Sequence, residues 1–250
     1  MINIVASEWL KLRSLRSTYY VLASTLSALA LTGFAAFSIS RGFDTKGPGG
    51  EPVGTGLGFS ADISPVLFGM LGVLAISGEY STGMIRLTLT TLRRPWLLPL
   101  SKATVVAAVA TIAGQTQAFA TYFTAQAVVG TRPIGASLSE PTALSEVLTT
   151  GAGCAVAAVT GLCLATLLRS TPGALIALIT LLTTPTVLER FLPAPWNDWM
   201  GSLTIPSLTR QLATAPDSGA FGPLSAAAIL AGYVAISLAA SALAITRRDA

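Results

Sequence analysis

The chain has 250 residues, of which 52% are hydrophobic and only 10% are charged, with a formal net charge of +4 and a mean hydropathy of +0.69. A soluble domain of this length carries about 25% charged residues, so the composition excludes a water-soluble globular fold. Histidine is absent, which excludes a Ser-His-Asp triad and an HExxH zinc site. The chain also has no Gly-x-x-x-x-Gly-Lys-Ser/Thr loop for ATP. We therefore predict no catalytic residue, no metal ligand and no nucleic-acid partner.

The residues before the first apolar segment form an amphipathic stretch. Ile2, Val5, Trp9 and Leu12 follow one another at spacings of 3, 4 and 3, which places them on one helical stripe. The pattern predicts a short helix along the inner membrane surface, with its Trp at the level of the headgroups. A simple basic flank to the first span is the alternative. The residues assigned to this interfacial helix are Glu8, Trp9, Lys11, Arg13 and Arg16.

Long stretches without charge mark the membrane spans. A helix needs about 20 residues to cross the hydrocarbon layer. The six predicted transmembrane helices are about 17–40, 57–78, 103–131, 147–168, 170–188 and 218–246. The whole chain, 1–250, is thus predicted to be one all-α integral membrane domain.

Charge distribution predicts the orientation of these spans. Six spans place both termini on one side, and ten of the 15 Lys and Arg residues fall on that side. Eight of the 11 acidic residues fall on the other side. By the positive-inside rule the termini are cytoplasmic. Between the fifth and sixth spans, Phe191, Trp196, Trp199 and Met200 lie among prolines, which is typical of short helices at the outer interface.

Two kinds of stripe occur within the spans. Thr111, Gln115, Tyr122 and Gln126 lie within about 40° of one line on the third span, and such polar side chains should face protein or water. They either line a substrate path or form hydrogen bonds to neighbouring helices, and the second interpretation is preferred. Small residues at four-residue spacing predict close helix packing on the fourth and sixth spans. These ridges are Gly153, Ala157, Gly161 and Ala165, and Ala227, Ala231, Ala235 and Ala239.

The loop between the second and third spans, Gly78–Ala103, is unusually rich in charge. It holds five of the 26 acidic and basic side chains, namely Glu79, Arg86, Arg93, Arg94 and Lys102. After Gly78-Glu79-Tyr80, the residues Ser81-Thr82-Gly83 indicate a turn or a helix start. Leucines then alternate with basic residues as in a short amphipathic helix, whose length Pro95 and Pro99 limit. These residues alone support a cytoplasmic docking surface and a plain topology signal equally.

The run Glu-Tyr-Ser-Thr-Gly-Met-Ile-Arg, followed by a basic, proline-containing cluster and Ser-Lys-Ala, resembles the permease subunits of type-2 ABC exporters, especially the small six-span bacterial ones. The opening Ser-Glu-Trp-Leu-Lys-Leu-Arg-Ser-Leu-Arg-Ser-Thr and the closing Thr-Arg-Arg-Asp-Ala are similar to the same family. The resemblance covers essentially the whole chain.

This resemblance implies a function. In such permeases the N-terminal stretch is an interfacial connecting helix, and the loop after the second span supplies a coupling helix that sits against a separate ATP-binding subunit. The residues that the resemblance assigns to the coupling region are Glu79, Tyr80, Thr82, Gly83, Met84 and Arg86, flanked by Arg93, Arg94 and Lys102.

The resemblance also implies a bacterial cytoplasmic membrane, a second permease copy that is identical or related, contact with membrane lipid, and ATP and magnesium on the partner subunit. This chain would hold no cofactor and would not be an enzyme by itself. The alternatives are an ion-coupled secondary transporter, whose usual mid-membrane acidic residue is missing from the predicted spans, and a non-transporting immunity or sensor subunit.

Overall fold

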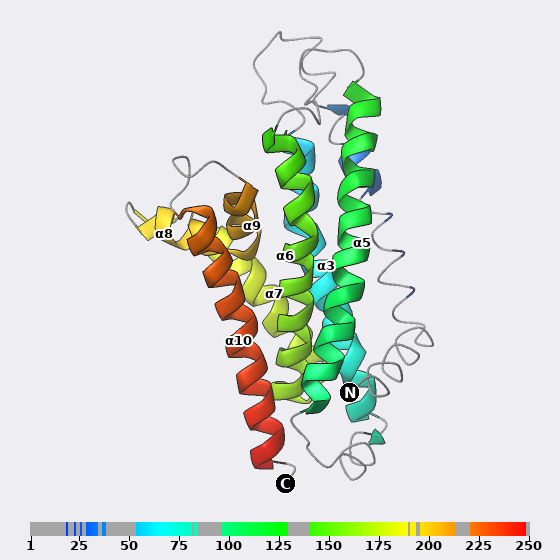
Figure 1. Cartoon of the computed structure of the whole chain (residues 1–250), viewed down its shortest axis with the longest axis vertical. Helices are drawn as coiled ribbons and strands as arrows, with labels where there is room; N and C mark the ends of the chain where they lie inside the picture. The colour runs from blue at the N-terminus through cyan, green and yellow to red at the C-terminus, as the bar shows by residue number, and fades with distance from the viewer. Residues whose placement is uncertain are drawn as a thin grey trace.

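The computed structural model describes residues 54–81, 83–84, 97–129, 141–189, 191–193, 196–213 and 221–248, together with eleven positions between 19 and 38. Within these ranges every regular element is a helix, so the all-α prediction is confirmed for this part of the chain (Figure 1). The helices are α3 (Gly54–Ser81), α5 (Leu97–Val129), α6 (Pro141–Leu168), α7 (Thr171–Leu188), α8 (Trp196–Ser202), α9 (Ile205–Ala213) and α10 (Pro223–Arg248).

Five of these helices are long and apolar enough to cross a membrane. Their spanning segments are Asp62–Tyr80, Leu98–Val128, Leu144–Leu168, Thr171–Leu188 and Pro223–Arg247. The chain is therefore a multi-pass helical membrane protein. Most of the predicted first span, 17–40, and all of the predicted interfacial helix, 1–16, lie outside the described residues, although the eleven positions described between 19 and 38 are helical.

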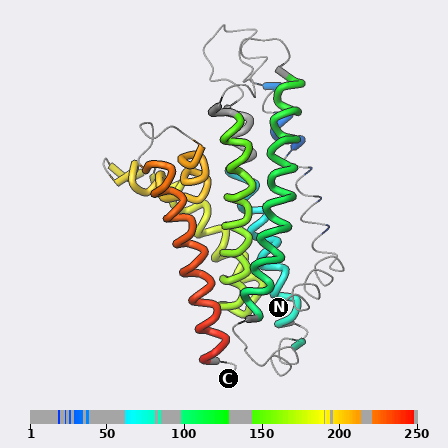
Figure 2. Tube along the Cα trace, viewed as in Figure 1, coloured from blue at the N-terminus to red at the C-terminus, as the bar shows by residue number. Residues whose placement is uncertain are grey.

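The five spanning helices alternate in direction. α3, α6 and α10 finish at the end of the bundle where α5 and α7 begin, as the trace in Figure 2 shows. We call this the inner end, because the positive-inside rule predicts it to be cytoplasmic, and the opposite end the outer end. The short helices α8 and α9 follow α7 at the outer end, between the fifth and sixth predicted spans (Figure 1).

Helix α6 forms the centre of the bundle. It packs against α3, α5, α7, α9 and α10. In an 18-residue stretch of its spanning segment 67% of the residues are buried, against 17% in the corresponding stretches of α7 and α10. The most extensive contact is between α3 and α6, where glycines allow the backbones to touch. A Cβ atom on Gly72 would overlap the carbonyl oxygen of Ala158, and one on Gly161 would overlap that of Gly69. Glycine is therefore required at positions 72 and 161 for the central packing.

The two predicted ridges of small residues have different outcomes. On α6, Ala157 and Ala165 are buried and Gly161 faces α3, so close packing is confirmed there. On α10 the four alanines of the ridge are all exposed. The ridge on the sixth span therefore makes no close packing with the described part of the chain, because α10 turns another face toward α6.

Candidate functional site

A buried ion pair joins α3 to α5 at the inner end. The Lys102 Nζ atom lies 2.9 Å from the Glu79 Oε1 atom, and the two side chains are 4% and 9% exposed. Glu79 is in the last turn of α3, and Lys102 is in the second turn of α5. The pair thus connects the two helices at the two ends of the segment that is predicted to be the coupling loop.

The next residue along α3 ties this end to α6. The Tyr80 hydroxyl donates a hydrogen bond of 3.4 Å to the carbonyl oxygen of Thr166. The guanidinium carbon of Arg169 lies 5.9 Å from the centre of the Tyr80 ring, within the range of a cation–π contact. Arg169 has a φ of +52°, in the left-handed region that few side chains other than glycine adopt. This backbone turn carries the chain from α6 into α7, so Tyr80 connects α3 with α6 and with the turn that leads into α7.

The chain leaves α3 through a turn, as the sequence predicts. Gly83 has a φ of +69°, which glycine adopts without a steric penalty, and its N–H donates to the carbonyl oxygen of Tyr80 at 3.3 Å. Met84 follows with 48% of its surface exposed.

The remaining residues assigned to the coupling region or to the interfacial helix lie outside the described residues. These are Thr82, Arg86, Arg93 and Arg94, and Glu8, Trp9, Lys11, Arg13 and Arg16.

Burial separates the predicted coupling residues into two groups. Glu79 and Lys102 are 7% and 3% exposed as whole residues, so they hold the ends of the loop and do not present a surface to a partner. Met84 is exposed and can reach one. The assignment of the whole set to a coupling region stays a prediction.

One residue of the polar stripe on α5, Gln115, forms a hydrogen bond to a neighbouring helix. The Gln115 Nε2 atom donates to the carbonyl oxygen of Val147 on α6 at 2.9 Å. The Thr111 hydroxyl donates to the carbonyl oxygen of Ala107, in its own helix, at 2.8 Å.

Farther along the stripe, Tyr122 is 4% exposed. The buried Oε1 atom of Gln126 has no hydrogen-bond partner among the described residues. The bond of Gln115 agrees with the packing interpretation, whereas a substrate path along the stripe stays a prediction.

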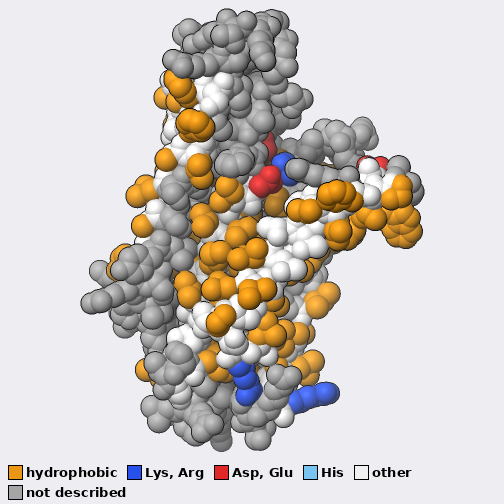
Figure 3. Space-filling view, turned by 180° about the vertical axis from the view of Figure 1, so that it is seen from behind, with side chains coloured by type: hydrophobic (Ala, Val, Ile, Leu, Met, Phe, Trp, Pro, Cys, Tyr) orange, Lys and Arg blue, Asp and Glu red, His pale blue; other side chains and the backbone are white. Residues whose placement is uncertain are grey.

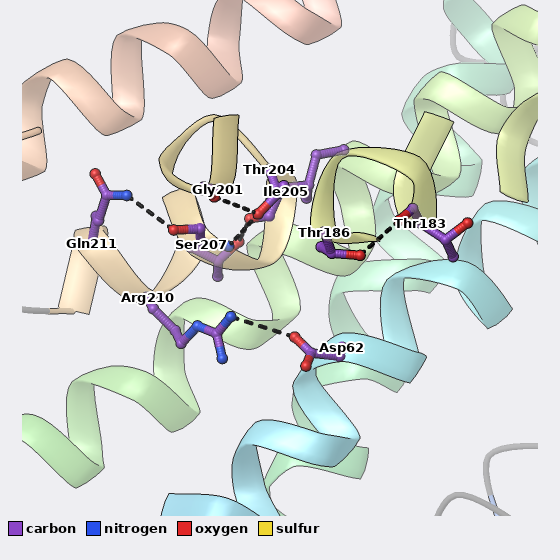
Figure 4. Close-up of polar contacts among 10 residues, drawn as sticks. Asp62, Thr183, Thr186, Gly201, Thr204, Ile205, Ser207, Arg210 and Gln211 are labelled. Carbon is purple, nitrogen blue, oxygen red and sulfur yellow. Dashed lines mark hydrogen bonds and ion pairs between the residues drawn. The ribbon is translucent and has the colours of Figure 1, made fainter. Parts of the chain in front are cut away.

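A polar cavity of about 550 Å³ opens near the outer end between α3, α7 and α9. Figure 4 shows Asp62 and Arg210 pointing toward one another from α3 and α9, and the Arg210 Nη2 atom lies 3.4 Å from the Asp62 Oδ1 atom. Figure 3 shows acidic and basic side chains side by side on an otherwise largely apolar face. Because both side chains are about half exposed, this pair contributes little to stability.

Hydroxyl groups add hydrogen-bond acceptors to this cavity. Thr183 donates to the carbonyl oxygen of Ile179 at 2.7 Å, and Thr186 donates to that of Thr183 at 2.7 Å. Each proton is thus used within α7, and the oxygen lone pairs remain for a ligand. No sequence pattern predicts this cavity, since Asp62 and Arg210 are 148 residues apart and no motif connects them.

The fold and these sites define a multi-pass helical membrane protein. Side-chain contacts join α3 to α5 and to α6 at the inner end, and a polar cavity lies near the outer end. Comparison with protein-family models found no match, and comparison with curated proteins found none either. Function is therefore argued from the motifs and from the geometry of the two ends of α3.

Proposed function

We propose that this chain is the transmembrane permease subunit of an ATP-driven exporter of the type-2 ABC class. The observation that carries the proposal is the buried ion pair between Glu79 and Lys102, which fastens both ends of the charged loop to the helix bundle. A loop that served only as a topology signal has no need of such an anchor, since buried ion pairs carry a desolvation cost. The motif resemblance and the lack of an ATP-binding loop in this chain agree with a separate ATP-binding subunit.

The anchor gives the loop a mechanical role. When ATP brings the two ATP-binding subunits together, a push on the loop reaches α3 and α5 at the same time, because their ends are paired. The contact of Tyr80 with Thr166 passes the same displacement to α6. α3 also carries Asp62, 17 positions before Glu79 and thus about 25 Å away at 1.5 Å per residue. A movement at the inner loop would therefore change the polar outer cavity that Asp62 lines.

The working transporter contains two permease subunits, identical or related, and two ATP-binding subunits that hold ATP and magnesium. Both termini of this chain are cytoplasmic in a bacterial membrane, and transport is outward. The inner and outer ends of α3 are then the two places where the inward-facing and outward-facing states differ.

The proposal is tested by purifying the tagged chain from its native membranes in detergent, with Arg86→Gln compared with Arg247→Gln. Both variants remove one positive charge predicted to be cytoplasmic, but only Arg86 belongs to the predicted coupling loop. We expect an ATP-binding subunit, identified by its phosphate-loop sequence, to co-purify with the wild type and the Arg247→Gln variant and to be reduced in the Arg86→Gln variant. Co-purification of no such subunit with the wild type would favour the non-transporting or ion-coupled alternatives.

A further inference from the structure

A groove between α7 and α10 opens sideways from the bundle. The two helices each pack against α6 and hardly touch one another. Two cavities lie between them, one of about 520 Å³ with its floor on α6 at Thr160, Cys163 and Leu164, and one of about 440 Å³ nearer α8. Leu181 and Tyr233 line both cavities, so the two spaces form one continuous groove, which we call the α7–α10 groove.

The hydroxyl groups of this groove have no proton to offer a ligand. Thr160 donates to the carbonyl oxygen of Val156 at 2.8 Å, and Ser237 donates to that of Tyr233 at 2.7 Å. The Tyr233 hydroxyl donates to the carbonyl oxygen of Leu203 at 3.2 Å. The remaining residues that line the cavity of about 520 Å³ are mainly aliphatic. An occupant that needs hydrogen bonds would lose them in that cavity, so this part of the groove favours an apolar occupant.

Size favours a hydrocarbon chain over a helix as an occupant that lies within the groove. An α-helix with its side chains is about 10–12 Å across, so a 15 Å length fills roughly 1,200 Å³ or more, whereas the two cavities have volumes of about 520 Å³ and 440 Å³. A single hydrocarbon chain is much narrower. The groove also lies along the spanning segments of α6, α7 and α10, where the surrounding solvent is the lipid hydrocarbon.

We propose that the α7–α10 groove binds one acyl chain of a membrane phospholipid. The inner cavity extends along α10 from Ile229 to Ala240, about 16 Å at 1.5 Å per residue. The other cavity continues to Trp196 and Trp199 on α8, and tryptophan is enriched at the membrane–water interface. The headgroup therefore lies beside α8, and the chain runs inward from that leaflet. This inference does not depend on the proposed transport function.

Gly232 provides the test, because it lines the groove and a Cβ atom on it would meet nothing within 4 Å. We therefore expect the side chain of Gly232→Leu to extend into the groove from a Cβ position that overlaps no other atom. Ala231→Leu is the matched control, since Ala231 is exposed on the same helix and lines neither cavity. Each full-length variant is reconstituted in palmitoyl-oleoyl-phosphatidylglycerol vesicles, extracted in a mild detergent and weighed by native mass spectrometry.

We expect one retained phospholipid on the wild type and on Ala231→Leu, and roughly tenfold lower retention on Gly232→Leu, equal to about 1.4 kcal/mol. If Gly232→Leu does not fold, Ala240→Leu narrows the inner part of the groove and gives the same comparison. Equal retention by the groove variants and the control overturns the proposal. So does a wild type that retains only detergent, or a lipid-free dimer whose interface covers the groove.

Discussion

We predict that the substitutions of Glu79 and Lys102 have non-additive effects on the free energy of unfolding, because the two side chains form a buried ion pair. The variants Glu79→Gln, Lys102→Met and their combination form a double-mutant cycle. Removal of one partner breaks the pair and leaves the other charge buried without this contact, which costs about 3–5 kcal/mol. Removal of both takes away the two charges of the pair together, so we expect the double variant to be destabilised by much less than the sum of the single variants.

The size of the coupling follows from the distance and the burial. Two unit charges 2.9 Å apart attract one another by about 6 kcal/mol at an effective dielectric constant of 20. Desolvation of both groups offsets part of this attraction, so we expect a coupling free energy of about 2–4 kcal/mol. The pair of Asp62 and Arg210, 3.4 Å apart and about half exposed, is the internal control, and its coupling should stay below about 1 kcal/mol.

The assay is reversible unfolding in mixed micelles of a mild detergent and sodium dodecyl sulfate, followed by circular dichroism at 222 nm. The four proteins of each cycle are measured in the same micelles, so that differences in the free energy of unfolding are comparable. If the Glu79 and Lys102 substitutions are additive within about 0.5 kcal/mol, the two side chains do not pair in the membrane. The loop would then have no ion pair that anchors its two ends to the bundle.

Two further predictions concern the packing around this anchor. Gly161→Ala should lower the melting temperature strongly or prevent folding, because its Cβ overlaps a backbone oxygen of α3. Gly232→Ala should not lower the melting temperature, because its Cβ meets open space and alanine is the better helix former. Similar effects of the two substitutions would contradict the close contact. Tyr80→Phe removes the hydrogen bond to Thr166 but keeps the ring beside Arg169, so we expect a loss of about 0.5–1.5 kcal/mol in the same unfolding assay. A loss as large as that of Lys102→Met would show that the hydroxyl does more than this one bond.

The approximate positions of the membrane spans could be predicted from the sequence more accurately than the residues at which the helices begin. The third predicted span starts at Ala103 because Lys102 ends the charge-free stretch, yet α5 starts at Leu97. Lys102 can lie inside the helix because Glu79 neutralises its charge. A prediction from charge-free stretches does not take this pairing into account, because the carboxylate is 23 residues away in the sequence. By contrast α7 begins at Thr171, within one residue of the prediction, because the Ser170 side chain accepts a hydrogen bond from the N–H of Gly173 and caps the helix locally.

The candidate sites also differ in whether they depend on neighbouring residues or on residues far apart in the sequence. The turn at Gly83 depends on residues next to it and was readable from the sequence. The pairing of Asp62 with Arg210 requires α9 to fold back beside the start of the α3 span, which no short pattern specifies. The ridge of alanines on α10 shows what a local pattern leaves open. Four-residue spacing identifies a face of small residues but does not predict which helix packs against that face.

Packing indicates which helices would move together in the proposed transport cycle. α3 and α6 are in backbone contact and α5 is joined to α3 by a buried ion pair, so we expect these three to move as one body, whereas the spanning segments of α7 and α10 are only 17% buried. Spin labels at Ile112 on α5, Leu148 on α6 and Ile236 on α10 test this, because all three side chains are exposed. In a complex with the proposed ATP-binding subunit, ATP should leave the distance from Ile112 to Leu148 unchanged and should alter the distance from Ile112 to Ile236. A change in the first distance as large as that in the second would show that the buried ion pair and the glycine contact do not hold α3, α5 and α6 together, and would remove the mechanical basis for coupling through α3.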